Sequence, residues 1–212
     1  MKEKKGENNV IGLTGTISAP VVFSHSVSDQ QFFRTVLAVK RLSGTVDSLP
    51  LILPERKIKI LDLTVGQRIS VRGQIRSYNR HVGGKNHLIL SVYVEELTSA
   101  DENSQDFNEL RLRGFICKTP VLRMTPLGRK ACDLLVAASR AYGRSDYLPV
   151  IAWGKTAVKV SAFSVGTQIE GIGRMQSRTY TKRFPDGSSE ERTAYEVSLM
   201  RADVVDTAGK EE

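Results

Sequence analysis

The chain has 212 residues, of which 40% are hydrophobic and 25% charged, and its formal net charge is +8. This composition predicts a folded globular protein, and no stretch approaches the roughly 18 apolar residues of a membrane-spanning helix. The positive charge favours an anionic partner such as nucleic acid. It is not confined to a basic tail, because 14 basic and 11 acidic residues lie up to Asp106 and 17 and 12 lie beyond it.

Residues that commonly catalyse reactions or bind metals are sparse in this sequence. Cys117 and Cys132 form no C-x-x-C pair, and the chain has three histidines, whereas a zinc site needs more ligands at closer spacing. The sequence also has no phosphate-binding loop, nucleotide fingerprint or nucleophile–histidine–acid set. We therefore expect no metal, no cofactor and no enzymatic activity. Both cysteines are interpreted as small buried residues of a cytoplasmic protein.

The first half of the chain opens with the polar segment MKEKKGENNV. Since it has no apolar core, we expect a disordered lead-in and neither a signal peptide nor a membrane anchor. The sequence that follows shows the period-two alternation of β-strands. We expect strands near 10–18, 31–41 and 48–53, a short helical patch near 56–63, and then a hairpin with Gly83-Gly84 at its tip.

The second half has the same kind of pattern. Strands are predicted at 109–118, 131–140 and 146–153, a helix at 155–163, and two more strands at 168–181 and 193–205. The segment Phe184-Pro-Asp-Gly187 joins the last two strands, and its Asp-Gly pair is a strong signal for a hairpin turn.

The two halves are related by an internal repeat at a spacing of 99 to 100 residues. Leu13-Thr-Gly15 is echoed by Leu112-Arg-Gly114, and Val65-Gly-Gln-Arg-Ile69 by Val165-Gly-Thr-Gln-Ile169. Two further blocks between them keep the same order and offset. This period is much longer than that of solenoid repeats and indicates two copies of one domain. We predict domains at 9–98 and 108–206, joined by a polar linker at 99–107.

The order of three strands, one short helix and two strands is that of the OB-fold. The predicted fold class is therefore all-β, with two tandem five-stranded OB-fold barrels that each carry one short helix between strands three and four. In the second copy the ligand-binding loops of such a barrel would span 119–129 and 181–192. An SH3-like barrel or a β-sandwich is the alternative, and the helix in the pattern argues against both.

The strand from Ser145 to Lys155 carries the features that suggest a binding surface. Alternation places Tyr147 and Trp153, the single tryptophan, on one face, with Lys155 directly behind them. Rings on one strand face beside positive charge can stack nucleic-acid bases. The alternative is that Trp153 is a core residue and Tyr147 lies at the rim.

Several blocks of the second copy resemble the bacterial single-stranded DNA-binding protein family, including the related primosomal replication protein. They are Leu112-Arg-Gly114, Arg123–Arg129, Ser145–Lys155, Val165-Gly166, Gly173–Tyr180 and Tyr195-Glu-Val197. The resemblance covers nearly all of 108–206, and the first copy looks like a diverged member.

The resemblance implies binding of single-stranded DNA with little sequence preference, in replication, repair or recombination, by a bacterial protein that is cytoplasmic and nucleoid-associated. It implies stacking by Tyr142, Tyr147, Trp153 and Tyr180. Phosphate contacts are expected from Arg129, Arg140, Arg144, Lys155, Arg174, Arg178, Lys182 and Arg183. A protein-interaction or assembly module with weak nucleic-acid binding remains open as an alternative, and so does binding of single-stranded RNA.

The first copy departs from this pattern, because its four equivalent positions hold no aromatic residue: Ser43, Ser48, Pro54 and Arg80. We expect this copy to supply phosphate contacts or a packing surface more than stacking. Its candidate residues are Arg72, Arg76, Tyr78 and Arg80. The pair Phe32-Phe33 is interpreted as core, with one ring on each face of its strand.

The sequence stops at Thr207-Ala-Gly-Lys-Glu-Glu212. It lacks the acidic tail and apolar tip with which many family members recruit replication and repair proteins, so we do not expect such recruitment. Because single-barrel relatives form tetramers or dimers, a tandem chain is expected to pair as a dimer that contains four barrels.

Overall fold

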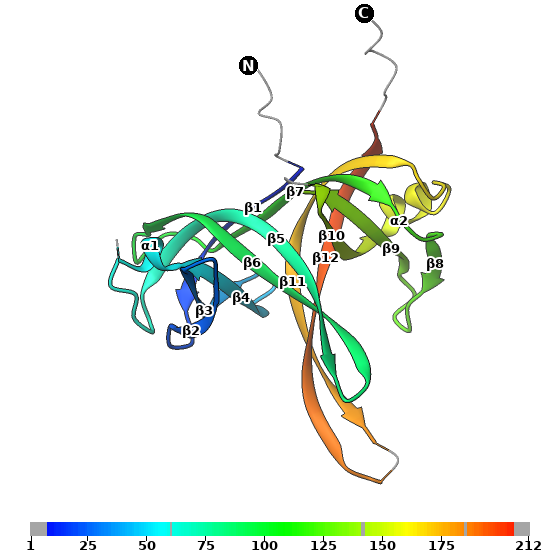
Figure 1. Ribbon diagram of the computed structural model, residues 1–212. Helices are drawn as coiled ribbons and strands as arrows, with labels where there is room; N and C mark the ends of the chain where they lie inside the picture. The colour runs from blue at the N-terminus through cyan, green and yellow to red at the C-terminus, as the bar shows by residue number, and fades with distance from the viewer. Residues whose placement is uncertain (1–7, 60, 141–142, 185, 206–212) are drawn as a thin grey trace, which may run out of the picture. The chain divides into compact units, whose positions relative to one another are not determined.

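The computed structural model describes residues 8–59, 61–140, 143–184 and 186–205, and these residues form mainly β-strands (Figure 1). The strands and helix of the first half are β1 (Asn9–Ile17), β2 (Val22–Val27), β3 (Gln30–Lys40), β4 (Val46–Pro54), α1 (Glu55–Ile58), β5 (Arg68–Val82) and β6 (Lys85–Ser99). Those of the second half are β7 (Phe107–Ile116), β8 (Val121–Met124), β9 (Lys130–Ser139), β10 (Ser145–Trp153), α2 (Gly154–Val160), β11 (Gln168–Arg183) and β12 (Ser189–Val204). The element order therefore repeats along the chain, as the sequence repeat predicts.

Contacts between residues divide the described chain into two compact units. The N-terminal unit contains residues 12–108 and 175–196, and the C-terminal unit contains residues 8–11, 109–174 and 197–205. The distal part of the hairpin β11–β12, from Met175 to Glu196, thus belongs to the unit that is formed mostly by the first copy. Within that unit, the Ser177 amide donates to Asp47 Oδ1 at 2.8 Å, and the Ser48 amide donates to Ser177 Oγ at 2.9 Å.

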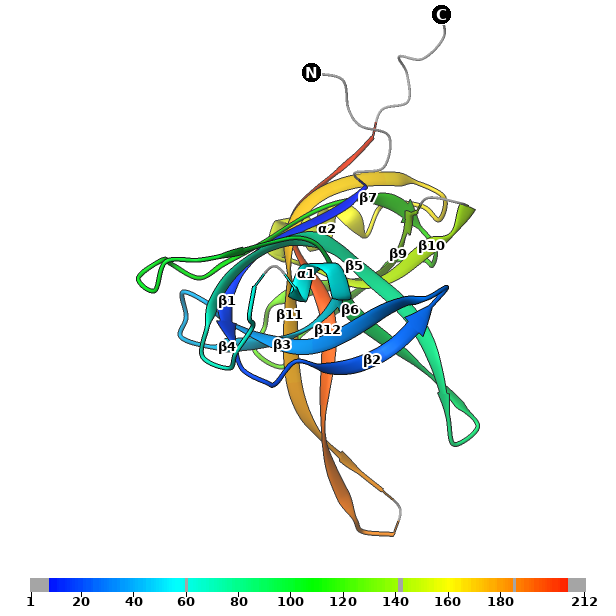
Figure 2. The same cartoon turned by 60° about the vertical axis from the view of Figure 1, so that its left-hand side comes forward.

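Strand pairing follows the same plan in both copies. In the first, the neighbours run β2-β3-β4-β6-β5-β1, and an extra pairing of β1 with β3 closes a ring of five strands. In the second, the neighbours run β8-β9-β10-β12-β11-β7, and β7 pairs with β9 in the same way. The pairs β4–β6 and β10–β12 are parallel, whereas the pairs β1–β3, β2–β3, β3–β4, β5–β6, β7–β9, β7–β11, β8–β9 and β9–β10 are antiparallel. The hairpins β2–β3 and β5–β6 can be followed in Figure 2.

The core is built from alternate residues of these strands. In β4, Leu49, Leu51 and Leu53 are fully buried, while the residues between them are more exposed. In β10, Leu148 and Val150 are buried in the same way. This period-two burial confirms the alternation that the sequence shows, since one face of each strand packs inward and the other faces out.

The repeated glycines lie where two backbones approach closely. A Cβ atom on Gly15 would lie 2.3 Å from the Ala38 carbonyl oxygen, and one on Gly114 would lie 2.4 Å from that of Ala137. These are the points at which β1 crosses β3 and β7 crosses β9. Gly is therefore required at both positions for steric reasons, which explains why the Leu-x-Gly block occurs in both copies.

We expect Gly114→Ala to lower the free energy of unfolding by about 2 kcal/mol, because the added methyl group must displace the β9 backbone. Urea unfolding of the full chain followed by circular dichroism measures this change. The neighbouring variant Phe115→Ala is the control, since that side chain is 43% exposed and should contribute less. Equal stability of Gly114→Ala and wild type would contradict the close approach.

The structure also differs from the sequence-based expectation in detail. The loop expected at 119–129 contains the strand β8, and the first copy contains the matching strand β2. All four residues of β8 are exposed, so no alternation marked it as a strand. The loop expected at 181–192 is shorter, because β11 extends to Arg183 and β12 begins at Ser189. Both helices end earlier than expected, at Ile58 and at Val160.

The two cysteines differ in their surroundings. Cys132 is buried in β9, and this burial raises the pKa of its thiol above the usual value. Cys117 is half-buried, so the expectation that both thiols are buried is wrong for Cys117. Its position directly after β7 leaves it at the end of the strand, where the core no longer covers it.

Candidate nucleic-acid interface

The outward face of β10 carries the two rings that the sequence singled out. Tyr147 is 48% exposed, and Trp153 is half-buried on the same face, opposite Leu148 and Val150. The indole Nε1 of Trp153 donates a hydrogen bond to Ser198 Oγ at 3.1 Å. This bond holds the ring in one orientation on the surface of the sheet. Trp153 is therefore an outward-facing residue and does not pack in the core.

Three of the predicted cationic residues of the C-terminal unit are exposed near the ends of its strands. Arg129 precedes β9, Arg144 precedes β10, and Lys155 lies in the first turn of α2, directly after Trp153. Lys155 is thus two residues from the indole. Arg174, on β11, is half-buried, and among the described residues its Nε has no hydrogen-bond acceptor.

Arg140 has a different environment from the other predicted cations. Its Nε lies 3.2 Å from Oδ2 of Asp146, a carboxylate with no exposed side-chain surface. The first copy has the same pair 99 residues earlier: Arg41 Nη2 lies 2.6 Å from Asp47 Oδ1, and Nε donates to Asp47 Oδ2 at 2.7 Å. The hydrogen bond to Asp47 raises the pKa of Arg41. This repeated pairing of charges favours a structural role for Arg140, although only Arg41 forms hydrogen bonds to its carboxylate through Nε and Nη2.

The cationic residues of the hairpin β11–β12 form a separate group in the N-terminal unit. Arg178 Cζ lies 5.6 Å from the ring centroid of Tyr180, which is 38% exposed. Lys182 Nζ and Arg192 Cζ lie 5.1 Å and 5.8 Å from the centroid of the Phe184 ring. Arg183 is exposed on the same hairpin. Sequence analysis did not single out Arg192, because only the folded hairpin brings it to Phe184.

The candidates of the first copy lie on β5, in the N-terminal unit. Arg72 forms an ion pair with Glu96 at 3.4 Å, and Arg76 Cζ lies 5.6 Å from the ring centroid of Tyr93. Tyr78 is 53% exposed, and Arg80 is exposed. Tyr142, the remaining predicted stacking residue, lies outside the described residues. The predicted site residues are thus distributed between the two units.

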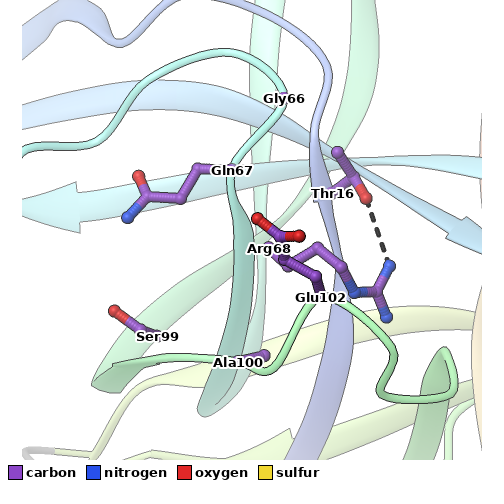
Figure 3. A pocket seen from close by; sticks show the side chains of 7 residues that line it. All are labelled: Thr16, Gly66, Gln67, Arg68, Ser99, Ala100 and Glu102. Carbon is purple, nitrogen blue, oxygen red and sulfur yellow. Dashed lines mark hydrogen bonds between the residues drawn. The ribbon is translucent and has the colours of Figure 1, made fainter.

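A pocket of about 370 Å³ in the N-terminal unit contains none of the predicted site residues (Figure 3). Its cation, Arg68, donates to Thr16 Oγ1 at 3.2 Å and forms an ion pair with Asp106 at 2.7 Å. The Lys40 amide also donates to Asp106, so the end of the segment between β6 and β7 is tied to the first copy. The charge of Arg68 is therefore already neutralised.

The described part of the chain has neither a metal-binding group of side chains nor a membrane-spanning helix. No group of three or more His, Cys, Asp or Glu side chains there could hold a metal ion. No helix among these residues is long and apolar enough to cross a membrane.

Comparison with known proteins supports the resemblance of the second copy. A sequence model of the Single-strand binding protein family matches residues 107–205. Over 81 residues the chain is 31% identical to Single-stranded DNA-binding protein 1 of Clostridium acetobutylicum, which covers 34% of this chain and 74% of that protein. The chain belongs to the single-strand binding protein family. It is also 28% identical over 106 residues to Single-stranded DNA-binding protein B of Bacillus subtilis, which covers 47% of this chain and 88% of that protein.

Comparison of folds extends the similarity to the first copy, because solved structures of one protein match nearly the whole chain. The crystal structure of wild-type single-stranded DNA-binding protein from Thermus aquaticus has a TM-score of 0.77 at 21% sequence identity, and it covers 96% of each chain. A deletion mutant of the same protein gives a TM-score of 0.74 at 22% identity, covering 98% of this chain and all of the other. At this identity the likeness is one of fold.

Proposed function

We propose that the chain folds as two OB-fold barrels and that it binds single-stranded DNA with little sequence preference. The closed ring of five paired strands in each copy supports the barrels, as does the likeness of fold to the Thermus aquaticus protein. Membership of the single-strand binding protein family supports single-stranded DNA as the ligand. The proposed domain boundaries are 9–98 and 108–206, with 99–107 between them.

The observation that carries this proposal is the placement of Tyr147 and Trp153 on the outward face of β10. Bases would stack on these rings, a contact worth about 1–3 kcal/mol per base that tolerates any sequence because every base has a π-face. Lys155, Arg129 and Arg144 would neutralise phosphates beside them. Arg174 would also contribute a charge on the same unit.

The first copy supplies an internal control for the role of these rings. From Asp47 to Leu53 its strand β4 alternates in burial as β10 does, yet Ser48 and Pro54 stand at the positions of Tyr147 and Trp153, and Pro54 is buried. A strand of this kind therefore does not need either ring in order to fold. This difference supports a binding role for Tyr147 and Trp153.

The hairpin β11–β12 and the strand β5 would provide further contacts in the N-terminal unit. Arg178, Lys182 and Arg183 would contact phosphates, and Tyr180 would stack. On β5 the corresponding residues are Arg72, Arg76, Tyr78 and Arg80. We also retain stacking by Tyr142 as part of the proposal. Arg140 is the weakest of the proposed phosphate ligands, because Asp146 already binds its guanidinium.

Other parts of the proposal follow from the ligand. Single-stranded DNA is exposed during replication, repair and recombination, so we propose a cytoplasmic, nucleoid-associated protein that acts in these processes. Two chains would pair to bring four barrels together. Light scattering coupled to size-exclusion chromatography tests this assembly, and a monomeric mass at micromolar concentration would contradict it.

The direct test is titration of the protein with poly(dT) at low salt. We expect quenching of Trp153 fluorescence, because this single tryptophan would be covered by a base. We also expect the affinity to fall steeply as the salt concentration rises, because phosphate contacts release counterions. An unquenched tryptophan at low salt would exclude the stacking mechanism, and tighter binding to RNA of equal length would exclude DNA as the preferred ligand.

A further inference from the structure

A group of aromatic rings in the first copy lies on the outward face of the sheet, around Pro54. Phe32 of β3 pairs directly with Pro54 of β4, and His25 of β2 pairs directly with Phe32. Directly opposed residues of antiparallel strands point to the same face. Since Leu53 points into the core, Pro54 and the residues in its row point to the opposite side of the sheet, where the neighbouring rings bury Pro54 itself. The strands β2, β3 and β4 can be followed side by side in Figure 2.

The rings in this group contact one another. The His25 and Phe32 rings are stacked, with centroids 4.9 Å apart and planes inclined by 13°. Phe32 is 8% exposed because the exposed His25 ring covers it. The Tyr93 ring lies 6.2 Å from Phe32, and Arg76 Cζ lies 5.6 Å from the centroid of Tyr93. Of these three rings His25 is exposed and Tyr93 half-buried, Phe32 lies beneath His25, and the Arg76 guanidinium lies beside Tyr93.

The register of the strands shows that this group occupies the place that Trp153 has in the second copy. Trp153 of β10 pairs with Ala131, whereas its counterpart Pro54 pairs with Phe32. Ser198, which accepts the indole hydrogen bond, pairs with Ile151, whereas Tyr93 pairs with Ile52 at the equivalent point. In the second copy one large ring has small neighbours. In the first copy a small central residue has large aromatic neighbours.

Basic residues lie near the rings in both copies. Ile52 pairs with the exposed Arg34 on β3, in the row that contains Tyr93. Arg34 therefore lies in the same row of paired residues as Tyr93, and Arg76 lies over the Tyr93 ring. In the second copy the nearby cation is Lys155, two residues after Trp153 in the sequence. Aromatic rings interleaved with arginines are the arrangement expected of a surface for single-stranded nucleic acid.

We propose that His25 and Tyr93, supported from below by the buried Phe32, form a second base-stacking site, in which Arg34 and Arg76 contact the flanking phosphates. This site deepens the function proposed above and depends on it. It replaces the expectation that the first copy contributes mainly phosphate contacts. Its rings come from β2, β3 and β6, whereas Tyr147 and Trp153 of the second copy both come from β10.

The test uses the full-length chain and a fluorescein-labelled oligo(dT), with binding followed by anisotropy. We expect the double variant His25→Ala/Tyr93→Ala to bind about 5- to 100-fold more weakly than wild type. Quenching of Trp153 at saturation should be unchanged, since that ring reports on the other copy. Phe23→Ala is the matched control: Phe23 is 55% exposed on the same strand but pairs with Phe33, on the opposite face from Phe32.

The outcomes separate this inference from the proposed function. If wild type binds and Trp153 is quenched, but the double variant binds equally well or Phe23→Ala is equally impaired, the second site is wrong. If wild type neither binds nor shows quenching, the proposed function fails and the second site fails with it. A cross-linking experiment on the wild-type protein does not depend on the folding of any variant. An oligonucleotide with 5-iododeoxyuridine should cross-link to peptides that contain His25, Phe32 or Tyr93, and cross-links confined to the second copy would overturn the proposal.

Discussion

Replacement of Trp153 by Ala is expected to weaken binding of single-stranded DNA by about 1–3 kcal/mol, which corresponds to about 5- to 150-fold in Kd. The reason is that Ala leaves no ring on the outward face of β10 for a base to cover. Anisotropy of a labelled oligo(dT) measures this change. The slope of the affinity against salt concentration should stay the same, because the slope reports phosphate contacts and Trp153 makes none in this mechanism.

Two further variants make the test of Trp153 specific. Trp153→Phe removes the hydrogen bond to Ser198 but keeps a ring, so it should recover most of the affinity. Pro54→Ala, at the equivalent position of the first copy, should change binding much less than Trp153→Ala. If Trp153→Phe were as weak as Trp153→Ala, the hydrogen bond and not stacking would be the important interaction.

The second large effect concerns stability. Asp47→Ala should lower the free energy of unfolding by about 3 kcal/mol, because it leaves the guanidinium of Arg41, whose side chain is only 20% exposed, without its carboxylate. It also removes the acceptor of the Ser177 amide, which joins the hairpin β11–β12 to β4 within the N-terminal unit. Urea unfolding followed by circular dichroism measures the loss. Asp146→Ala should have a similar effect in the second copy.

A surface pair provides the control for this prediction. Asp133 forms an ion pair with Arg123, and each side chain is 42% exposed, so Asp133→Ala should cost less than about 1 kcal/mol. Adding Arg41→Met to Asp47→Ala should restore part of the lost stability, since no buried charge would then remain unpaired. If Asp47→Ala and Asp133→Ala were equally stable, the buried pair would not support the turn between β3 and β4.

The positions of Tyr147 and Trp153 could be predicted from the sequence because they depend on a local property. Successive residues of a strand point to opposite faces, so Leu148 and Val150 in the core place their neighbours outside. The edge strands could not be predicted in this way. Val121 and Met124 of β8 are both exposed, and a strand that is paired along one side with exposed residues shows no period-two signal.

The role of Arg140 shows a different limit of the sequence. As one basic residue among many it resembled the phosphate ligands, and only folding of the turn brings it to Asp146, six residues later. The same relation between Arg41 and Asp47 was present in the repeat, at the same offset of 99 residues. Searching the repeat for paired opposite charges would have found both.

The strands of the core, the repeat and the face on which each residue of β10 lies follow from the sequence, because these depend on the order of neighbouring residues. Which strands lie next to one another follows instead from the tertiary structure. The tertiary structure brings His25, Phe32 and Tyr93 together from three strands. It also places the distal part of the hairpin β11–β12 in the N-terminal unit. Such contacts depend on backbone pairing between distant segments, and the backbone is chemically the same in every strand.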